Sequence, residues 1–75
     1  MRRELKYIVV NDTQPVIFPR TLVHADVAYS AGGRITSAGF CEHDRMVGWS
    51  CWGHSESLDI SSKASDSDLL DRVFE

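Results

Sequence analysis

The C-terminal segment Ser65–Phe74 constrains the fold most strongly, because it predicts a short amphipathic helix that needs a surface to cover. A serine opens the segment and aspartates follow in its first turns, where a helix start favours hydroxyl caps and negative charge. Its apolar residues form one stripe at spacings of one and four: Leu69, Leu70, Val73 and Phe74. A helix of about ten residues is marginal alone, so the stripe must dock on another part of the chain.

Four segments can supply that surface as strands. Leu5–Val10 is rich in β-branched and aromatic residues and predicts a strand. Gln14–Pro19 contains two prolines, which lack the N–H donor, and so predicts an edge strand or an extended connector. Arg34–His43 and Met46–Ile60 predict the two long strands of a hairpin, joined by a two-residue turn at Asp44-Arg45.

A second helix is predicted between these strands. Thr21–Ser30 has apolar residues at helical spacing, with Thr21 or His24 as its start, and Gly32-Gly33 ends it. The whole order predicts an α+β fold: a small antiparallel sheet of three to four strands with two short helices packed on one face. Residues 1–75 form a single α+β domain, because a chain of 75 residues has room for only one.

Composition narrows the class of protein. Apolar residues make up 43% of the chain and charged residues 25%, which is typical of a folded globular domain. The net charge of −3 excludes a strongly basic protein, so direct binding of nucleic acid is not expected. A chain this short buries only about 60% of its unfolded surface, and pairing of subunits is a common remedy, so a homo-oligomer is expected.

The first residues of the chain indicate whether a secretory leader is expected. Met1-Arg2-Arg3 is basic, but Glu4 and Lys6 interrupt any apolar run that could follow, so no secretory leader is expected. The longest apolar runs have four residues, far short of a membrane span. The expectation is a soluble intracellular protein whose two cysteines stay reduced, which disfavours a disulfide between them.

Cys41, His43, Cys51 and His54 are four zinc-compatible side chains within fourteen residues. The first two share one face of a strand, whereas Cys51 and His54, three apart, point to opposite faces unless a bulge forms at Gly53. Neither pair resembles the turn that usually holds zinc ligands. Zinc binding is therefore disfavoured by the spacing, although a structural zinc-binding protein stays among the alternatives.

Catalysis is also disfavoured by the pattern. Cysteine, histidine and carboxylates are present, but no nucleophile lies at a strand-to-helix elbow. No glycine-rich run opens a helix to hold a phosphate or an oxyanion. The sequence predicts a protein that is not an enzyme, with no catalytic residue and no cofactor.

The two-residue turn sets the register of the predicted hairpin and so decides which side chains share each of its two faces. One face is a candidate core made of Ala38, Phe40, Val47, Trp49 and Cys51. The opposite face mixes polar and aromatic groups: Ser37, Cys41, His43, Ser50, Trp52 and His54. A slip of one residue in register would exchange parts of the two sets.

The mixed face is the candidate binding surface. Its indole can stack on a planar ring, its hydroxyls and imidazole can bond the edges of that ring, and arginines can neutralise a phosphate. The candidate ligand-binding residues are Trp52, His54, Ser50, Ser55, Ser57, Arg34 and Arg45, with the Arg2-Arg3 pair as a further source of charge. The same residues suit a protein–protein contact or a homodimer interface. Glu56 falls on the inward side of this strand with Leu58 and Ile60, unless the strand ends before it.

Several motifs together indicate a family. "SAGF" at Ser37–Phe40, "GHSESL" at Gly53–Leu58 and the closing helix "DSDLLDRVF" resemble the motifs of short uncharacterised proteins from phages and prophages. Those proteins similarly share an S-A-G-F strand, a G-x-S-x-S-L strand and an S-x-x-x-D-x-x-L helix. The similarity extends from Lys6 to Phe74.

The resemblance implies a role for a protein of this size. Small phage proteins of this kind often act against host immunity, in the host cytoplasm. It implies a non-enzymatic anti-defence protein that sequesters a nucleotide second messenger of the host. One alternative is a protein inhibitor that binds a host defence complex directly, as anti-CRISPR proteins do. Another is a structural zinc-binding or regulatory phage protein.

Overall fold

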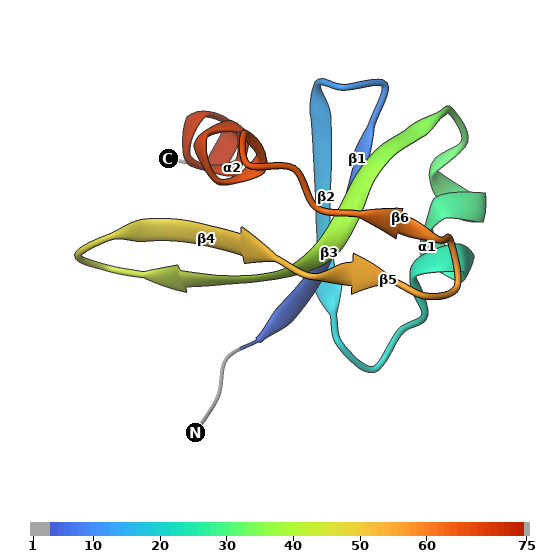
Figure 1. Cartoon of the computed structure of the whole chain (residues 1–75), viewed down its shortest axis with the longest axis horizontal. Coiled ribbons are helices and arrows are strands. Elements are labelled where there is room, and N and C mark those ends of the chain that lie inside the picture. The colour runs from blue at the N-terminus through green and yellow to red at the C-terminus, as the bar shows by residue number, and fades with distance from the viewer. Residues whose placement is uncertain (1–3, 75) are drawn as a thin grey trace.

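A computed structural model describes residues 4–74 and contains a four-stranded antiparallel sheet in the order β2-β1-β3-β4 (Figure 1). Its strands are β1 (Leu5–Val10), β2 (Gln14–Pro19), β3 (Ile35–Asp44) and β4 (Gly48–Trp52). A small second sheet pairs β5 (His54–Ser55) with β6 (Ile60–Ser61), and the helices are α1 (His24–Ala31) and α2 (Asp66–Phe74). The predicted α+β class is confirmed. Within the described residues, neither helix is long and apolar enough to cross a membrane.

Strand β1 is the centre of the structure, because it pairs with β2 on one side and β3 on the other. Its residues Tyr7 and Ile8 are 0% exposed and Val9 is 2% exposed. Neighbouring residues of a strand point to opposite faces of the sheet. Burial of three consecutive side chains therefore means that both faces of β1 are covered.

The two helices cover opposite faces of the sheet. Ala28 of α1 packs in a cluster with Ile8, Val10, Phe18 and Ala38. Leu70 of α2 packs in a separate cluster with Tyr7, Val9 and Cys41. The expectation that both helices pack on one face is wrong. Its physical cause is the unbroken apolar run Tyr7–Val10 of β1, which needs an apolar cover on each face of the sheet.

The β3–β4 hairpin differs from the expected one. The turn has three residues, Arg45 to Val47, and β3 rejoins β4 at the pair Asp44 and Gly48. The Asp44 carboxylate accepts hydrogen bonds from the Met46 N–H at 2.7 Å and the Val47 N–H at 3.1 Å, which fixes this turn. Gly48 follows with φ of 93°, a conformation that favours glycine.

This turn exchanges the two faces of β4 relative to the prediction, because the register changes by an odd number of residues. Trp49 and Cys51 lie opposite His43 and Cys41, on the α2 face. Trp52 and Ser50 lie opposite Phe40 and Glu42, on the α1 face. The expected core of Ala38, Phe40, Val47, Trp49 and Cys51 is therefore wrong as a set, and Val47 is 74% exposed.

Met46–Ile60 does not form one long strand. The chain turns at Gly53, whose φ is 91°, and an added Cβ there would lie 2.8 Å from the Phe40 ring. Strand β5 then ends at Ser55, and a turn leads back to β6. Glu56 lies in this turn and is exposed, so the alternative in which the strand ends before it is the one observed.

Helix α2 is anchored by its first residue. Asp66 is 2% exposed and accepts hydrogen bonds from the Tyr7 hydroxyl, from the Ser37 hydroxyl at 3.0 Å and from the Lys63 N–H at 2.8 Å. The last bond closes the start of the helix as a capping box does. Burial, aided by the Asp66 carboxylate, raises the pKa of Tyr7 well above its usual range. These bonds fix α2 to the sheet.

The same helix protects an edge of the sheet. The N–H of Trp49 donates to the Asp71 carboxylate at 2.8 Å, and the N–H of Cys51 donates to the Ser67 hydroxyl at 3.0 Å. These amides of β4 are therefore satisfied by α2 and cannot pair with another strand. The opposite edge strand, β2, contains two prolines that have no N–H to donate.

Candidate functional site

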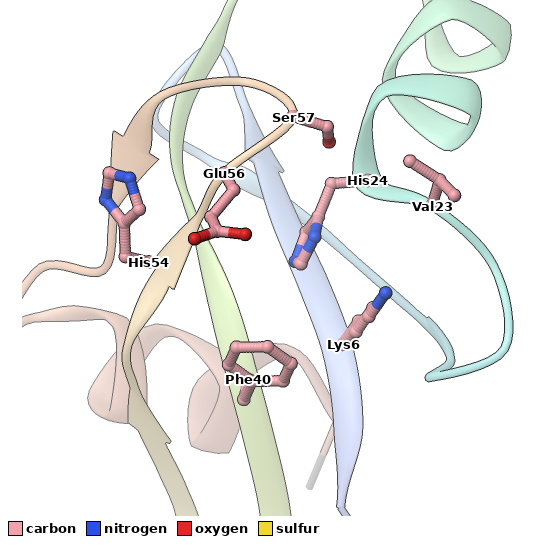
Figure 2. A pocket seen from close by; sticks show the side chains of 7 residues that line it. All are labelled: Lys6, Val23, His24, Phe40, His54, Glu56 and Ser57. Carbon is pink, nitrogen blue, oxygen red and sulfur yellow. The ribbon is translucent and has the colours of Figure 1, made fainter.

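The candidate site is an open cavity of about 460 Å³ at the start of α1 (Figure 2). It is called the Phe40 cavity here and is lined by Lys6, Val23, His24, Phe40, His54, Glu56 and Ser57. These residues come from β1, the start of α1, β3, and β5 with the turn that follows it. A cavity of this size falls within the range of about 300–1,000 Å³ that small-molecule sites occupy.

Aromatic rings form one wall of the cavity. The His24 ring lies edge-on to Phe40, with 5.8 Å between the ring centroids, and edge-on to Phe18 at 5.4 Å. His24 is 4% exposed, and its Nε2 donates to the Gly39 carbonyl at 2.8 Å. Burial lowers the pKa of His24, and the nearby Lys6 ammonium adds to this effect. The imidazole is therefore neutral at physiological pH.

Groups of both charges face the cavity. The Lys6 ammonium donates one hydrogen bond to the Leu22 carbonyl at 2.7 Å. Figure 2 shows the Glu56 carboxylate between the rings of His54 and His24. The site can therefore offer a cation to an anionic group and a carboxylate to a hydrogen-bond donor.

The rim of the cavity is held by hydrogen bonds. The Ser57 hydroxyl accepts from the Ala25 N–H at 3.2 Å, which ties the β5–β6 turn to the first turn of α1. His54 Nδ1 lies 2.9 Å from the Ser61 hydroxyl, and its Nε2 lies 3.6 Å from an Asp59 carboxylate oxygen. These contacts orient the histidine, although its side chain is 45% exposed.

The structure brings together only part of the predicted binding set. His54 and Ser57 line the Phe40 cavity. Ser55 is adjacent in sequence but 0% exposed, and its hydroxyl accepts from the Leu58 N–H at 3.3 Å, so it stabilises the turn. Trp52 and Ser50 are half-buried in β4 and do not line the cavity. An exposed face centred on Trp52 was expected and is not observed.

The predicted arginines lie elsewhere. Arg34 precedes β3, with its guanidinium 3.7 Å from the Asp12 carboxylate. Arg45 lies in the turn between β3 and β4. Arg2 and Arg3 lie outside the described residues. The cation at the cavity is instead Lys6, whose sequence signal was a charged residue inside an otherwise apolar strand.

The four candidate zinc ligands do not converge. Cys41, Cys51 and His43 lie on the α2 face of the hairpin, whereas His54 lies in β5, beyond the break at Gly53. Across residues 4–74, no group of three or more histidine, cysteine or acidic side chains is arranged to hold a metal ion.

The Phe40 cavity combines an aromatic wall, a neutral imidazole, an ammonium, a carboxylate and a hydroxyl. This set can bind a small polar molecule that carries both a planar ring and an anionic group. No family model, curated protein or solved structure matches the chain.

Proposed function

We propose that this protein is a non-enzymatic binding protein that captures a small ligand of the nucleotide class in the Phe40 cavity. One observation carries the proposal: an aromatic ring, a lysine and hydrogen-bonding side chains from distant segments meet at one cavity of about 460 Å³. The resemblance to phage proteins makes a nucleotide second messenger of host defence the expected ligand. Sequestration of that messenger in the host cytoplasm is then the expected role.

The lining residues have complementary tasks in this proposal. The Phe40 ring offers a surface for a planar base. Lys6 contacts the phosphate, because an ammonium has three donors and the Leu22 carbonyl takes one of them. Glu56 accepts from an amino or hydroxyl group of the ligand. His54 can donate a ring N–H to a phosphate oxygen of the ligand.

Ligand retention tests the proposal. The protein is incubated with a panel of mononucleotides, cyclic nucleotides and ADP-ribose-like nucleotides, desalted and heated, and the released molecules are identified by mass spectrometry. Lys6→Met should lower retention of the bound nucleotide at least tenfold. Lys63→Met is the matched control, because Lys63 contacts Asp12 and does not line the cavity. If the wild-type protein retains no nucleotide at micromolar concentration, the proposal fails.

A specific observation favours a second candidate, a protein inhibitor that binds a host defence complex. The hairpin turn exposes Met46 at 92% and Val47 at 74%. At the end of α2, Val73 is 50% exposed and Phe74 is 45% exposed. Large exposed apolar groups of this kind are typical of protein contacts. In this case the double substitution Met46→Ser with Val47→Ser abolishes capture of the host protein, and Lys6→Met has no effect.

A further inference from the structure

Cys41 and Cys51 face each other across the β3–β4 hairpin. They are direct partners in the register of the two strands, and both are free thiols. Both belong to the cluster on the α2 face, so their side chains point to the same side of the sheet. The two thiols are therefore neighbours in the folded protein, although ten positions separate them in the chain.

The hydrogen bonds of β4 show whether Cys41 and Cys51 form a hydrogen-bonded or a non-hydrogen-bonded pair of the ladder. The N–H groups of Trp49 and Cys51 point away from β3, because they donate to Asp71 and Ser67 of α2. In an antiparallel ladder, a residue whose N–H points away from its partner belongs to a non-hydrogen-bonded pair. The Cα atoms of such pairs lie about 4.5 Å apart, with side chains close together. That separation falls within the range of about 4.4–6.8 Å spanned by disulfides.

We infer that Cys41 and Cys51 form a redox-modification site, which closes to an intramolecular disulfide when a low-molecular-weight disulfide such as oxidised glutathione is present. The Cys51 thiolate attacks oxidised glutathione, forms a mixed disulfide and releases one glutathione. The Cys41 thiolate then attacks the Cys51 sulfur and releases the second glutathione. Two electrons pass to oxidised glutathione, and the two thiol protons end on the two reduced glutathione molecules.

Burial sets the order of these steps. Cys41 is 0% exposed and packs beneath α2, whereas Cys51 is half-buried and can meet a solute. Burial raises the pKa of Cys41 to about 12 and that of Cys51 to about 11. Because the thiolate is the attacking species, the rate of closure should rise about tenfold per pH unit between neutral pH and the pKa of Cys51. The site is therefore slow to close at neutral pH.

Peptide mapping tests the inference directly. The folded protein is incubated with oxidised glutathione, remaining thiols are alkylated, and the protein is digested with trypsin without reduction. Cleavage after Arg34, Arg45 and Lys63 places Cys41 in peptide 35–45 and Cys51 in peptide 46–63. The expected product is these two peptides joined by a disulfide. It should come from chains that are not cross-linked to one another on a non-reducing denaturing gel, in a protein with an unchanged far-ultraviolet circular dichroism spectrum.

Two serine variants separate the steps. Cys41→Ser should accumulate the mixed disulfide of Cys51 with glutathione, because no second thiol can displace it. Cys51→Ser should stay unmodified in the folded state, because Cys41 is buried. If a variant fails to fold, the linked wild-type peptides at unchanged circular dichroism still support the inference. Glutathione that stays on wild-type Cys51, disulfides formed only between chains, or closure only in urea would overturn it.

Discussion

Replacing Asp66 with alanine should destabilise this protein more than any other change of a charged residue in α2. Asp66 is 2% exposed and accepts from the Tyr7 hydroxyl, the Ser37 hydroxyl and the Lys63 N–H. Tyr7 and Ser37 are themselves buried, at 0% and 1% exposure. The substitution therefore leaves two hydroxyl groups in the interior without their acceptor and removes the bond that closes the start of α2.

The size of this effect follows from those contacts. A buried polar group without a partner costs about 1–3 kcal/mol, and loss of a helix cap costs about 1 kcal/mol. Two hydroxyls and one cap then sum to about 3–7 kcal/mol. A native domain has about 0.05–0.15 kcal/mol of stability per residue, or about 4–11 kcal/mol for a chain of this length. Asp66→Ala should therefore bring the protein close to unfolding at 25 °C.

Urea unfolding followed by tryptophan fluorescence measures this effect. The Trp49 ring lies 6.1 Å from the Phe74 ring of α2, so its emission reports whether the helix is docked. Asp68→Ala is the matched control, because Asp68 is exposed in the same turn of the helix. The control should change the free energy of unfolding by less than about 0.5 kcal/mol. If Asp66→Ala comes within about 1 kcal/mol of the control, the buried network does not anchor the helix.

Three further predictions concern pH and packing. The folded state raises the pKa of Tyr7 and that of Cys41, the latter to about 12. The contribution of these two groups to stability is therefore complete below about pH 9 and is lost as the pH rises above that value. Urea midpoints measured from pH 7 to 11 should fall, and should fall less steeply in Tyr7→Phe. The pKa of His24 is lowered, so its contribution to stability is present above about pH 6.5 and is lost as the pH falls below that value. His24→Gln should therefore reduce the change of the urea midpoint with pH between pH 7 and 5. The same pH dependence in the variant and in the wild type would contradict this. Gly39→Ala places a Cβ 2.4 Å from the Trp52 carbonyl oxygen and should lower the free energy of unfolding by about 1–3 kcal/mol. An unchanged melting temperature in calorimetry would show that β3 and β4 can separate at this point without cost.

The elements that the sequence predicted well are those with local signals. The β-branched run of β1, the prolines of β2 and the aspartates at the start of α2 each act on their own segment. Which face of the sheet each helix covers depends on a signal outside the helix itself. The unbroken apolar run Tyr7–Val10 of β1 already indicated burial on both faces of the sheet, and the prediction of both helices on one face conflicted with it.

The hairpin register could not be read from the strands themselves. It depends on the Asp44 carboxylate, which accepts from two amides of a three-residue turn, and on the positive φ of Gly48. A two-residue turn at Asp44-Arg45 was equally compatible with the residue types. The wrong turn put Trp52 on the wrong face and led to an exposed indole surface that the structure does not have.

The candidate cavity was missed for a related reason. Lys6, His24 and Phe40 come from three separate segments, so no spacing in the chain connects them. Only His54 and Ser57 of the predicted set reach the cavity, because the break at Gly53 directs β5 and its turn toward α1. Lys6 in an apolar strand was the one available signal, since a charged residue there must reach solvent or a partner.

The most direct test of the central proposal is an amide NMR titration of the folded protein with the nucleotides of the panel. Binding in the Phe40 cavity predicts saturable shifts at Lys6, Phe40 and the segment from His54 to Ser57, and unchanged signals at Arg34 and Arg45. No shift with any nucleotide at millimolar concentration, or shifts confined to the β3–β4 turn and the end of α2, would contradict the proposal.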